Sequence, residues 1–231
     1  VRVGLCDQFD KANIDENVRG IVLKGAGNAF IAGADISEFG QKMEGPDLHT
    51  ALKNIEYSEK PVVAAINGPA LGGGLETALC CNYRIATEKS IVGLPEVNLG
   101  LLPGAGGTQR LPRIVGPSQA LKIMLSGVPV PAKKALDQGI LDGISNGNLV
   151  EDAISFLNKK LDETTEHPKV RDLNEKLLEA RGNENVMAEA KALASKSRKG
   201  QFAPSQIIKC VEAAICLLYT SDAADEGLGV D

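Results

Sequence analysis

Two kinds of apolar pattern recur along the chain, one typical of short buried strands and the other typical of helices. Uninterrupted or alternating apolar runs predict strands at residues 18–24, 61–66, 83–86, 90–94 and 139–144. Apolar residues three and four positions apart predict helices at residues 1–12, 48–58, 75–81, 117–126, 132–138 and 148–161. Strands and helices that alternate in this way predict an α/β fold, without specifying which one.

Two of the predicted helices carry an apolar face that should be buried against the rest of the protein. In residues 1–12 this face consists of Val1, Leu5, Phe9 and Ala12. In residues 148–161 it consists of Val150, Ile154, Leu157 and Leu161.

The most informative stretch lies between residues 61 and 116. Its first apolar run passes through a turn into Gly72-Gly73-Gly74, and a predicted helix with the acid Glu76 at its start follows. A glycine run at a helix N-terminus allows close backbone approach and leaves amide N–H groups facing an anion. A second acid, Glu96, follows a proline further along. Two carboxylates near such a point suit acid/base chemistry beside a stabilised oxyanion.

Each of these features also has a simpler structural explanation. Glu76 could complement the dipole of its own helix, which is worth about 0.3–1 kcal/mol, and Glu96 could be a solvated turn residue. The glycine-rich residues 104–107 could form only a flexible turn. The segment FIAGADI at residues 30–36 could be a strand end with a tight turn. The residues taken singly leave these alternatives open.

Composition and charge narrow the classes of function. The chain has 231 residues, of which 43% are apolar and 24% charged, and this suits one globular domain with a sizeable core. A net charge of −5 argues against binding to nucleic acid or to an anionic membrane. No apolar run approaches the ~18 residues that a membrane helix needs. We therefore expect neither a nucleic acid nor a membrane as a partner.

The cysteines and histidines argue against a metal site and against a histidine-activated nucleophile. The five cysteines show neither metal-ligand spacing nor a disulfide framework, so we expect reduced and mostly buried thiols and no metal site. They are Cys6, Cys80, Cys81, Cys210 and Cys216. The two histidines, His49 and His167, stand in polar neighbourhoods, which argues against a histidine-based nucleophilic triad. Lys133, Lys134 and Arg113 are expected on solvated faces rather than as phosphate ligands.

Residues 65–106 closely resemble the crotonase (enoyl-CoA hydratase/isomerase) superfamily. Its pattern A-x-x-G-x-A-x-G-G-G-x-E is matched by AINGPALGGGLE at residues 65–76. Its pattern P-E-x-x-L-G-x-x-P-x-x-G is matched by PEVNLGLLPGAG at residues 95–106. A match of this length is far more specific than a lone glycine motif. The resemblance extends over residues 1–214 and implies an α/β spiral of ββα units with C-terminal helices.

The resemblance also implies roles for individual residues. Glu76 would hold and activate a water, and Glu96 would deliver a proton. The backbone N–H groups of Ala34 and Gly73 would form an oxyanion hole, and the backbone around Ala32 and Ala34 would lie against the CoA adenine. Contacts with substrate or CoA are implied for Ala32, Gly33, Asp35, Ile36, Gly72, Gly74, Pro95 and Gly104.

The activity implied by the resemblance is that of an enoyl-CoA hydratase, which adds water to a trans-2-enoyl-CoA thioester to give 3-hydroxyacyl-CoA in fatty-acid β-oxidation. Two alternatives stay open: a Δ3–Δ2-enoyl-CoA isomerase in the same pocket, and an inactive fragment that binds CoA esters. No cofactor is expected, because CoA is part of the substrate. Single-function members form trimers or paired trimers, so a homo-oligomer is a candidate assembly. The expected location is the cytoplasm of a bacterium or, in a eukaryote, the peroxisome.

The resemblance divides the chain into three regions. Residues 1–160 are expected to form the crotonase domain without its first strands, since the chain begins with Val1 rather than Met. Residues 161–214 are expected to form a helical linker. Within it, FAPSQIIKCVEAA at residues 202–214 resembles the linker helix of multifunctional fatty-acid oxidation enzymes. That helix leads into an NAD-dependent 3-hydroxyacyl-CoA dehydrogenase part, to which any NAD would belong and which we expect to be absent here.

The last region, residues 215–231, is expected to be foreign to the natural protein. Its sequence CLLYTSDAADE matches the translation of a sequencing-library adapter. Such a segment is left out of reasoning about the fold.

Overall fold

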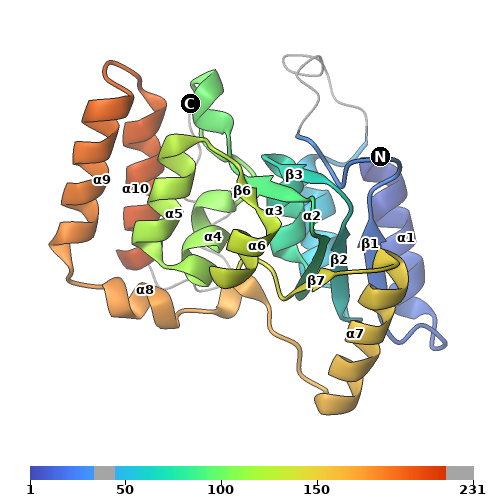
Figure 1. Cartoon of the computed structure of the whole chain (residues 1–231). Coiled ribbons are helices and arrows are strands. Elements are labelled where there is room, and N and C mark those ends of the chain that lie inside the picture. Colours follow the sequence, from blue (N-terminus) through green and yellow to red (C-terminus); the bar gives the residue numbers. More distant parts are fainter. Residues whose placement is uncertain (34–44, 217–231) are drawn as a thin grey trace.

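A four-stranded parallel sheet with the strand order β1-β2-β4-β7 lies at the centre of the protein. The computed structural model describes residues 1–33 and 45–216 (Figure 1). The four strands are β1 (Ile21–Lys24), β2 (Val62–Ile66), β4 (Tyr83–Thr87) and β7 (Gly143–Ser145). Parallel strands need long crossover connections, and the helices between the strands supply them.

A second sheet of three strands, in the order β3-β5-β6, lies beside the first. Its strands are β3 (Pro69–Leu71), β5 (Ile91–Gly93) and β6 (Val130–Pro131). β3 and β5 are parallel, whereas β5 and β6 are antiparallel. An isolated bridge joins Ile31 to Ala70. This bridge places the segment that ends at Gly33 next to the strand that leads into the three glycines.

Strand β2 is buried along its whole length, and its alternate residues pack into two different cores. The smaller core is shared with helix α7 (Leu149–Glu163). It receives Val63 and Ala65 from β2. The main core receives Val62, Ala64 and Ile66. Side chains on a strand alternate between faces, and a strand covered on both sides is therefore apolar throughout.

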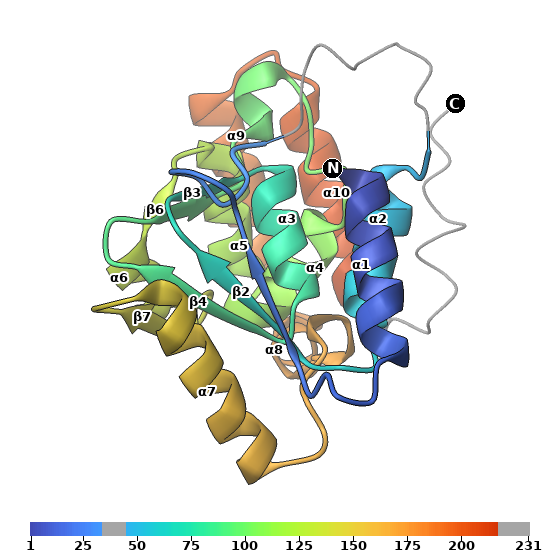
Figure 2. The ribbon, with the colours of Figure 1, turned by 90° about the vertical axis from the view of Figure 1, so that its right-hand side faces the viewer.

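The helices surround the two sheets. They are α1 (Arg2–Ile14), α2 (Leu48–Glu56), α3 (Gly73–Cys80), α4 (Gly107–Val115), α5 (Pro117–Ser126), α6 (Ala132–Asp137), α7, α8 (Glu175–Ala180), α9 (Glu184–Ser197) and α10 (Ala203–Cys216), with 3₁₀ turns η2 (Glu96–Leu99) and η3 (Val170–Asp172). Figure 2 shows α3 between the strands on one side and α1 and α2 on the other. The last three helices gather at the end of the molecule opposite α1, where α10 packs on α4 and α5.

The structure corrects three details of the predicted elements, the first being that Val1, expected on the buried face of α1, is exposed. The strand expected at residues 139–144 is only β7, because residues 139–142 form a turn in which the N–H groups of Ile140 and Leu141 donate to the carbonyl of Ala135. On α7 the buried positions are Leu149, Ala153 and Leu157. Ile154 is 46% exposed. The buried stripe starts one residue earlier than predicted.

Helix α4 has no counterpart among the predicted helices. Its sequence GTQRLPRIV begins after a run of glycines and contains Pro112, and both features normally argue against a helix interior. Arg113 of this helix was expected on a solvated face, but it is 2% exposed. Its Nε and Nη1 donate to the backbone carbonyls of Arg171 and Gln109, and these two hydrogen bonds offset part of the cost of burying the charge.

Other expectations about single residues are confirmed. Lys133 and Lys134 are exposed. All five cysteines are unpaired thiols and four of them are buried, the exception being Cys216. No helix within the described residues combines the length and the hydropathy of a membrane-spanning segment.

Candidate active site

Glu76 lies in the first turn of α3 and is 2% exposed. Its Oε1 accepts two hydrogen bonds of 2.8 Å, from the backbone N–H groups of Ala105 and Gly107. Gly107 is the first residue of α4, so the carboxylate lies at the N-terminus of a second helix, where anions are stabilised. Glu76 therefore does more than complement the dipole of its own helix.

Opposing effects act on the ionisation of Glu76. Burial raises the pKa of the carboxyl above its usual value. The hydrogen bonds from Gly107 and Ala105 and the charge of Arg110 lower it, but the net pKa remains raised. A carboxylate in this setting binds a proton more readily than one in water, as a general base requires.

Glu96 lies in η2 and approaches the glycine run from the other side. A methyl group added to Gly72 would lie 3.1 Å from Oε1 of Glu96. Gly72 also has a φ of 55°, a backbone conformation that only glycine adopts without strain. The carboxyl of Glu96 therefore lies directly against the turn that begins α3.

The other oxygen of Glu96, Oε2, is buried and has no hydrogen-bond partner among the described residues. Buried polar atoms are nearly always paired in native proteins, so an orphaned oxygen marks a place for a proton or a ligand. Burial, followed by the negative charge of Glu76, raises the pKa of Glu96 to about 7. Because the charge of Glu76 acts on Glu96, the fold brings close together two carboxyls that lie 20 residues apart in the sequence.

The three glycines serve different purposes in this site. Gly73 begins α3, where a helix leaves the N–H without an intrahelical acceptor. A methyl group on Gly74 would lie 1.9 Å from the carbonyl oxygen of Ile31, so glycine is needed there for close packing. Gly72 adjoins Gly33, whose Cα would lie 4.0 Å from a methyl group on Gly72. The described segment that ends at Gly33 therefore lies against the start of the glycine run.

Four of the remaining predicted contact residues belong to the described part of the chain. Ala32 and Gly33 are exposed. Pro95 is half-buried directly before Glu96, and Gly104 is exposed in the turn before α4. Ala34, Asp35 and Ile36 lie outside the described residues. The role of each predicted site residue remains a proposal.

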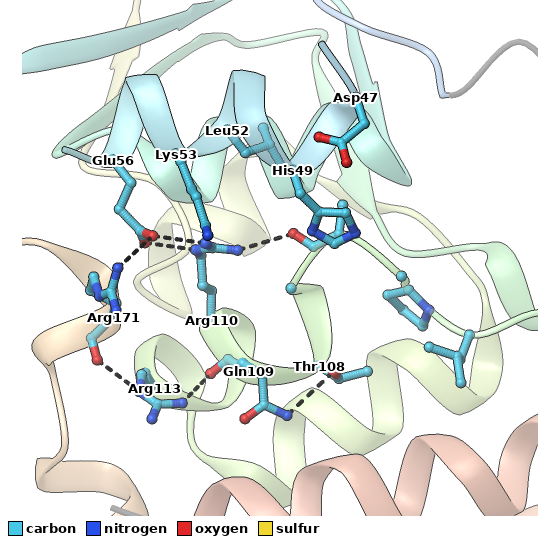
Figure 3. Close-up of a pocket in the computed structure, with 15 residues that line it drawn as sticks. Asp47, His49, Leu52, Lys53, Glu56, Thr108, Gln109, Arg110, Arg113 and Arg171 are labelled. Atoms are coloured by element: carbon cyan, nitrogen blue, oxygen red, sulfur yellow. Dashed lines mark hydrogen bonds and ion pairs between the residues drawn. The ribbon is translucent and has the colours of Figure 1, made fainter. Parts of the chain in front are cut away.

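A cavity of about 410 Å³ lies between α2 and the segment from Leu102 to Arg113 (Figure 3). Ala105 lines this cavity and also donates to Glu76, so the cavity adjoins the buried carboxylate. His49 and Lys53 of α2 contribute polar groups to the wall. Figure 3 shows Arg110 reaching from α4 towards Glu56 of α2.

The sequence analysis did not identify Arg110 or Glu56 as parts of the site. Arg110 donates to Glu56 from Nε at 2.8 Å and from Nη2 at 2.9 Å. Glu56 also accepts a hydrogen bond of 3.4 Å from Arg171. A sequence prediction of a helix at residues 107–115 would have found Arg110. It would have placed this residue in the first turn of the helix, close to the glycine-rich segment that precedes it.

A buried carboxyl and a half-buried one, close together beside a glycine-rich helix start, equip an α/β protein for acid/base chemistry. A family model described as Enoyl-CoA hydratase/isomerase matches residues 2–205. The chain belongs to the enoyl-CoA hydratase/isomerase family, as the motifs at residues 65–76 and 95–106 predict.

Individual relatives agree with this assignment. The chain is 41% identical over 219 residues to the peroxisomal bifunctional enzyme of Cavia porcellus, covering 94% of this chain and 30% of that protein. It is 38% identical over 224 residues to the fatty acid oxidation complex subunit alpha of Shewanella loihica, covering 91% and 32%. It thus spans about a third of the length of these relatives.

A solved structure confirms the predicted crotonase-like fold with C-terminal helices. The enoyl-CoA hydratase from Bacillus anthracis has a TM-score of 0.64 and 30% sequence identity to this chain. The likeness covers 96% of this chain and 82% of that structure.

Proposed function

We propose that this chain carries an enoyl-CoA hydratase site, which adds water across the 2,3 double bond of a trans-2-enoyl-CoA thioester to give 3-hydroxyacyl-CoA. The observation that carries the proposal is the pairing of Glu76 with Glu96. One carboxyl is held by two backbone amides, and the other has a buried unpaired oxygen and a pKa of about 7. The family assignment and the relatives' names support the same reaction.

Glu76 is the base of the proposed reaction. Both amide hydrogen bonds go to Oε1, and this arrangement orients Oε2 for a water. The water oxygen bonds to C3 of the substrate while one water proton passes to Glu76. The electron pair of the double bond moves towards the thioester carbonyl and forms an enolate.

Glu96 supplies the proton for C2. With a pKa of about 7, a large fraction of this carboxyl is protonated at neutral pH. Transfer of that proton to C2 returns the electron pair from the enolate and completes the 3-hydroxyacyl product. The proton taken up by Glu76 then has to return to Glu96, through water, before the next cycle.

The enolate oxygen would be stabilised by the N–H of Gly73 at the start of α3 together with that of Ala34. One preorganised donor of this kind is typically worth about 2.7–4 kcal/mol in the transition state. The CoA part would contact the exposed backbone at Ala32 and Gly33, next to Gly72. CoA enters as part of the substrate, and no residue in this scheme needs a cofactor.

A second activity, Δ3–Δ2-enoyl-CoA isomerisation, is favoured by one observation. Isomerisation needs a group that moves a proton at C2, and the pKa of Glu96 near 7 suits proton uptake as well as release. This reaction needs no bound water, so it depends less on Glu76.

The experiment is an assay of the full chain with crotonyl-CoA and with a 3-enoyl-CoA, followed by product identification. We expect 3-hydroxyacyl-CoA from crotonyl-CoA. The double variant Glu76→Gln/Glu96→Gln is the matched control. A cooperatively folded wild-type chain that forms no more 3-hydroxyacyl-CoA than this control would overturn the proposal.

A further inference from the structure

The backbone of Ala105 is held by two hydrogen bonds, one from its N–H and one to its carbonyl oxygen. Its N–H donates to Oε1 of Glu76 at 2.8 Å, and its carbonyl oxygen accepts a hydrogen bond of 3.0 Å from Nη1 of Arg110. The N–H and the carbonyl belong to two adjacent peptide planes that meet at the Cα of Ala105, so this one residue connects a guanidinium to the carboxylate assigned as the base. The hydrogen bond from the guanidinium restrains the backbone at Ala105, and with it the N–H that holds Glu76.

Arg110 is in turn fixed by Glu56. The two side chains form a paired, fork-like contact, with Nε 2.8 Å from Oε1 and Nη2 2.9 Å from Oε2. The side chain of Glu56 is 3% exposed and that of Arg110 is 14% exposed. A bidentate pair shielded from water fixes the plane of the guanidinium, and the remaining nitrogen, Nη1, donates to the carbonyl of Ala105.

The turn before α4 is shaped to admit this guanidinium. A methyl group on Gly106 would lie 2.0 Å from Nη1 of Arg110. Gly106 also has a φ of 96°, which favours glycine. The guanidinium therefore lies against the Cα of Gly106. In the sequence, Gly106 stands between Ala105 and Gly107, whose N–H groups donate to Glu76.

We propose that Arg110, oriented by Glu56, is a positioning residue that holds the Glu76 carboxylate in place and in its ionised form through the backbone of Ala105. This inference rests on the proposed function, because it assigns Arg110 a part in the same reaction. Arg110 acts through Ala105 and by its charge, without touching the substrate.

The groups around Glu76 determine what loss of Arg110 would do. Arg110 of α4, His49 of α2, Glu96 of η2 and Cys80 of α3 face it. Burial raises the pKa of Glu76, while Arg110 and His49 lower it. Burial also raises the pKa of Cys80, so this thiol stays neutral. Removal of Arg110 thus takes away a positive charge and the hydrogen bond to the carbonyl of Ala105. Both favour the ionised carboxylate of Glu76.

The first variant is Arg110→Met, and its readout is the pH titration of the Glu76 carboxyl carbon by NMR, assigned with Glu76→Gln. We expect the pKa of Glu76 to rise by about one unit or more, since an opposite charge nearby lowers a carboxyl pKa by about 1–3 units. The acidic limb of the hydration pH profile should move to higher pH in parallel. An unchanged titration in the folded variant would overturn the proposal.

The second variant, Arg110→Lys, separates charge from geometry. Lysine keeps the positive charge but cannot form the bidentate contact with Glu56. We expect a titration close to wild type and a kcat lower by about tenfold to a hundredfold, with little change in KM, as for a misplaced catalytic group. A folded lysine variant with wild-type kcat would overturn the positioning role, and this holds even if Arg110→Met does not fold.

Arg84→Met is the matched control. Arg84 is also buried and paired, 3.0 Å from Asp142, and it donates to the carbonyl of Ile140 at 2.7 Å. Its loss should lower stability without moving the titration of Glu76. If the wild-type chain hydrates no enoyl-CoA, the proposed function fails, whereas the NMR titration still decides whether Arg110 controls Glu76.

Discussion

At the scale of single residues, the site depends on two carboxyls, one buried and one half-buried, that differ in their hydrogen bonds. Glu76 is held by the N–H groups of Ala105 and Gly107, which stabilise its anion. Glu96 has a buried oxygen without a partner among the described residues, which favours its protonated form. This difference divides the roles of base and acid between two residues of the same type.

The first prediction concerns these two carboxyls. Glu76→Gln and Glu96→Gln should each keep the fold, because the amide is nearly isosteric and its carbonyl oxygen can still accept. Each should lose hydration by about 10²–10⁴-fold, the usual contribution of a positioned proton transfer. The double variant should be far less impaired than the product of the single effects. Steady-state hydration rates check this, and retention of more than about a tenth of the activity by either single variant would contradict it.

The second prediction concerns stability and pH. The pKa of Glu96 is raised from 4.5 to about 7, so the folded state binds more protons than the unfolded state between these values. Stability attributable to Glu96 is therefore present at low pH and lost as pH rises towards 7. Glu96→Gln cannot ionise and should melt at a higher temperature than wild type above pH 7. Below pH 4 the difference should disappear. Melting curves of both proteins across pH test this, and an equal difference at all pH values would contradict it.

At the scale of elements, the sequence predicted most strands and helices correctly because their apolar residues follow the period of the element that forms. The boundaries of α5 and the start of α2 agree with the structure, and α3 starts two residues before its predicted range. The glycines at the start of α4 and the proline inside it are typical of a turn, so the sequence did not predict this helix. Packing of α4 against α3, α5 and α10 outweighs that preference.

The sequence predicted only some of the residues that come together in the site. The motifs pointed to Glu76 and Glu96, but no local pattern indicates that Ala105 and Gly107 hold Glu76. That contact depends on the position of α4, which the sequence analysis missed. Arg110 and Glu56 were missed for the same reason, since their pairing joins positions 54 residues apart.

The third prediction tests the close packing at the start of α3. Gly74→Ala would place a methyl group 1.9 Å from the carbonyl oxygen of Ile31, so the segment before Gly33 must move. We expect a loss of about 1–3 kcal/mol of stability, as for other overpacked sites. Gly104→Ala is the control, because the nearest atom to its methyl group is 3.9 Å away. Denaturant unfolding measures both, and equal stabilities of the two variants would contradict the packing argument.

At the scale of the whole molecule, the C-terminal helices share a core with the sheets. Val170, Leu177, Ile207 and Val211 belong to the same buried cluster as Ile66 of β2. The side chain of Gln109 in α4 donates to the carbonyl of Cys210 in α10 at 2.9 Å. Residues 161–214 therefore help to fix the helix whose N-terminus holds Glu76.

The last prediction follows from this shared core. A chain that ends at residue 162 would expose the faces of α4 and α5 that α10 covers. The apolar surface exposed corresponds to several buried side chains, each worth about 1.5–3 kcal/mol, a large part of the stability of a typical domain. We expect the truncated chain to lose its cooperative thermal transition. The control ends at residue 216 and removes only the adapter-like segment beyond α10, so it should melt like the full chain. A cooperative transition at the wild-type temperature in the shorter chain would show that residues 1–162 fold independently of the helices that follow.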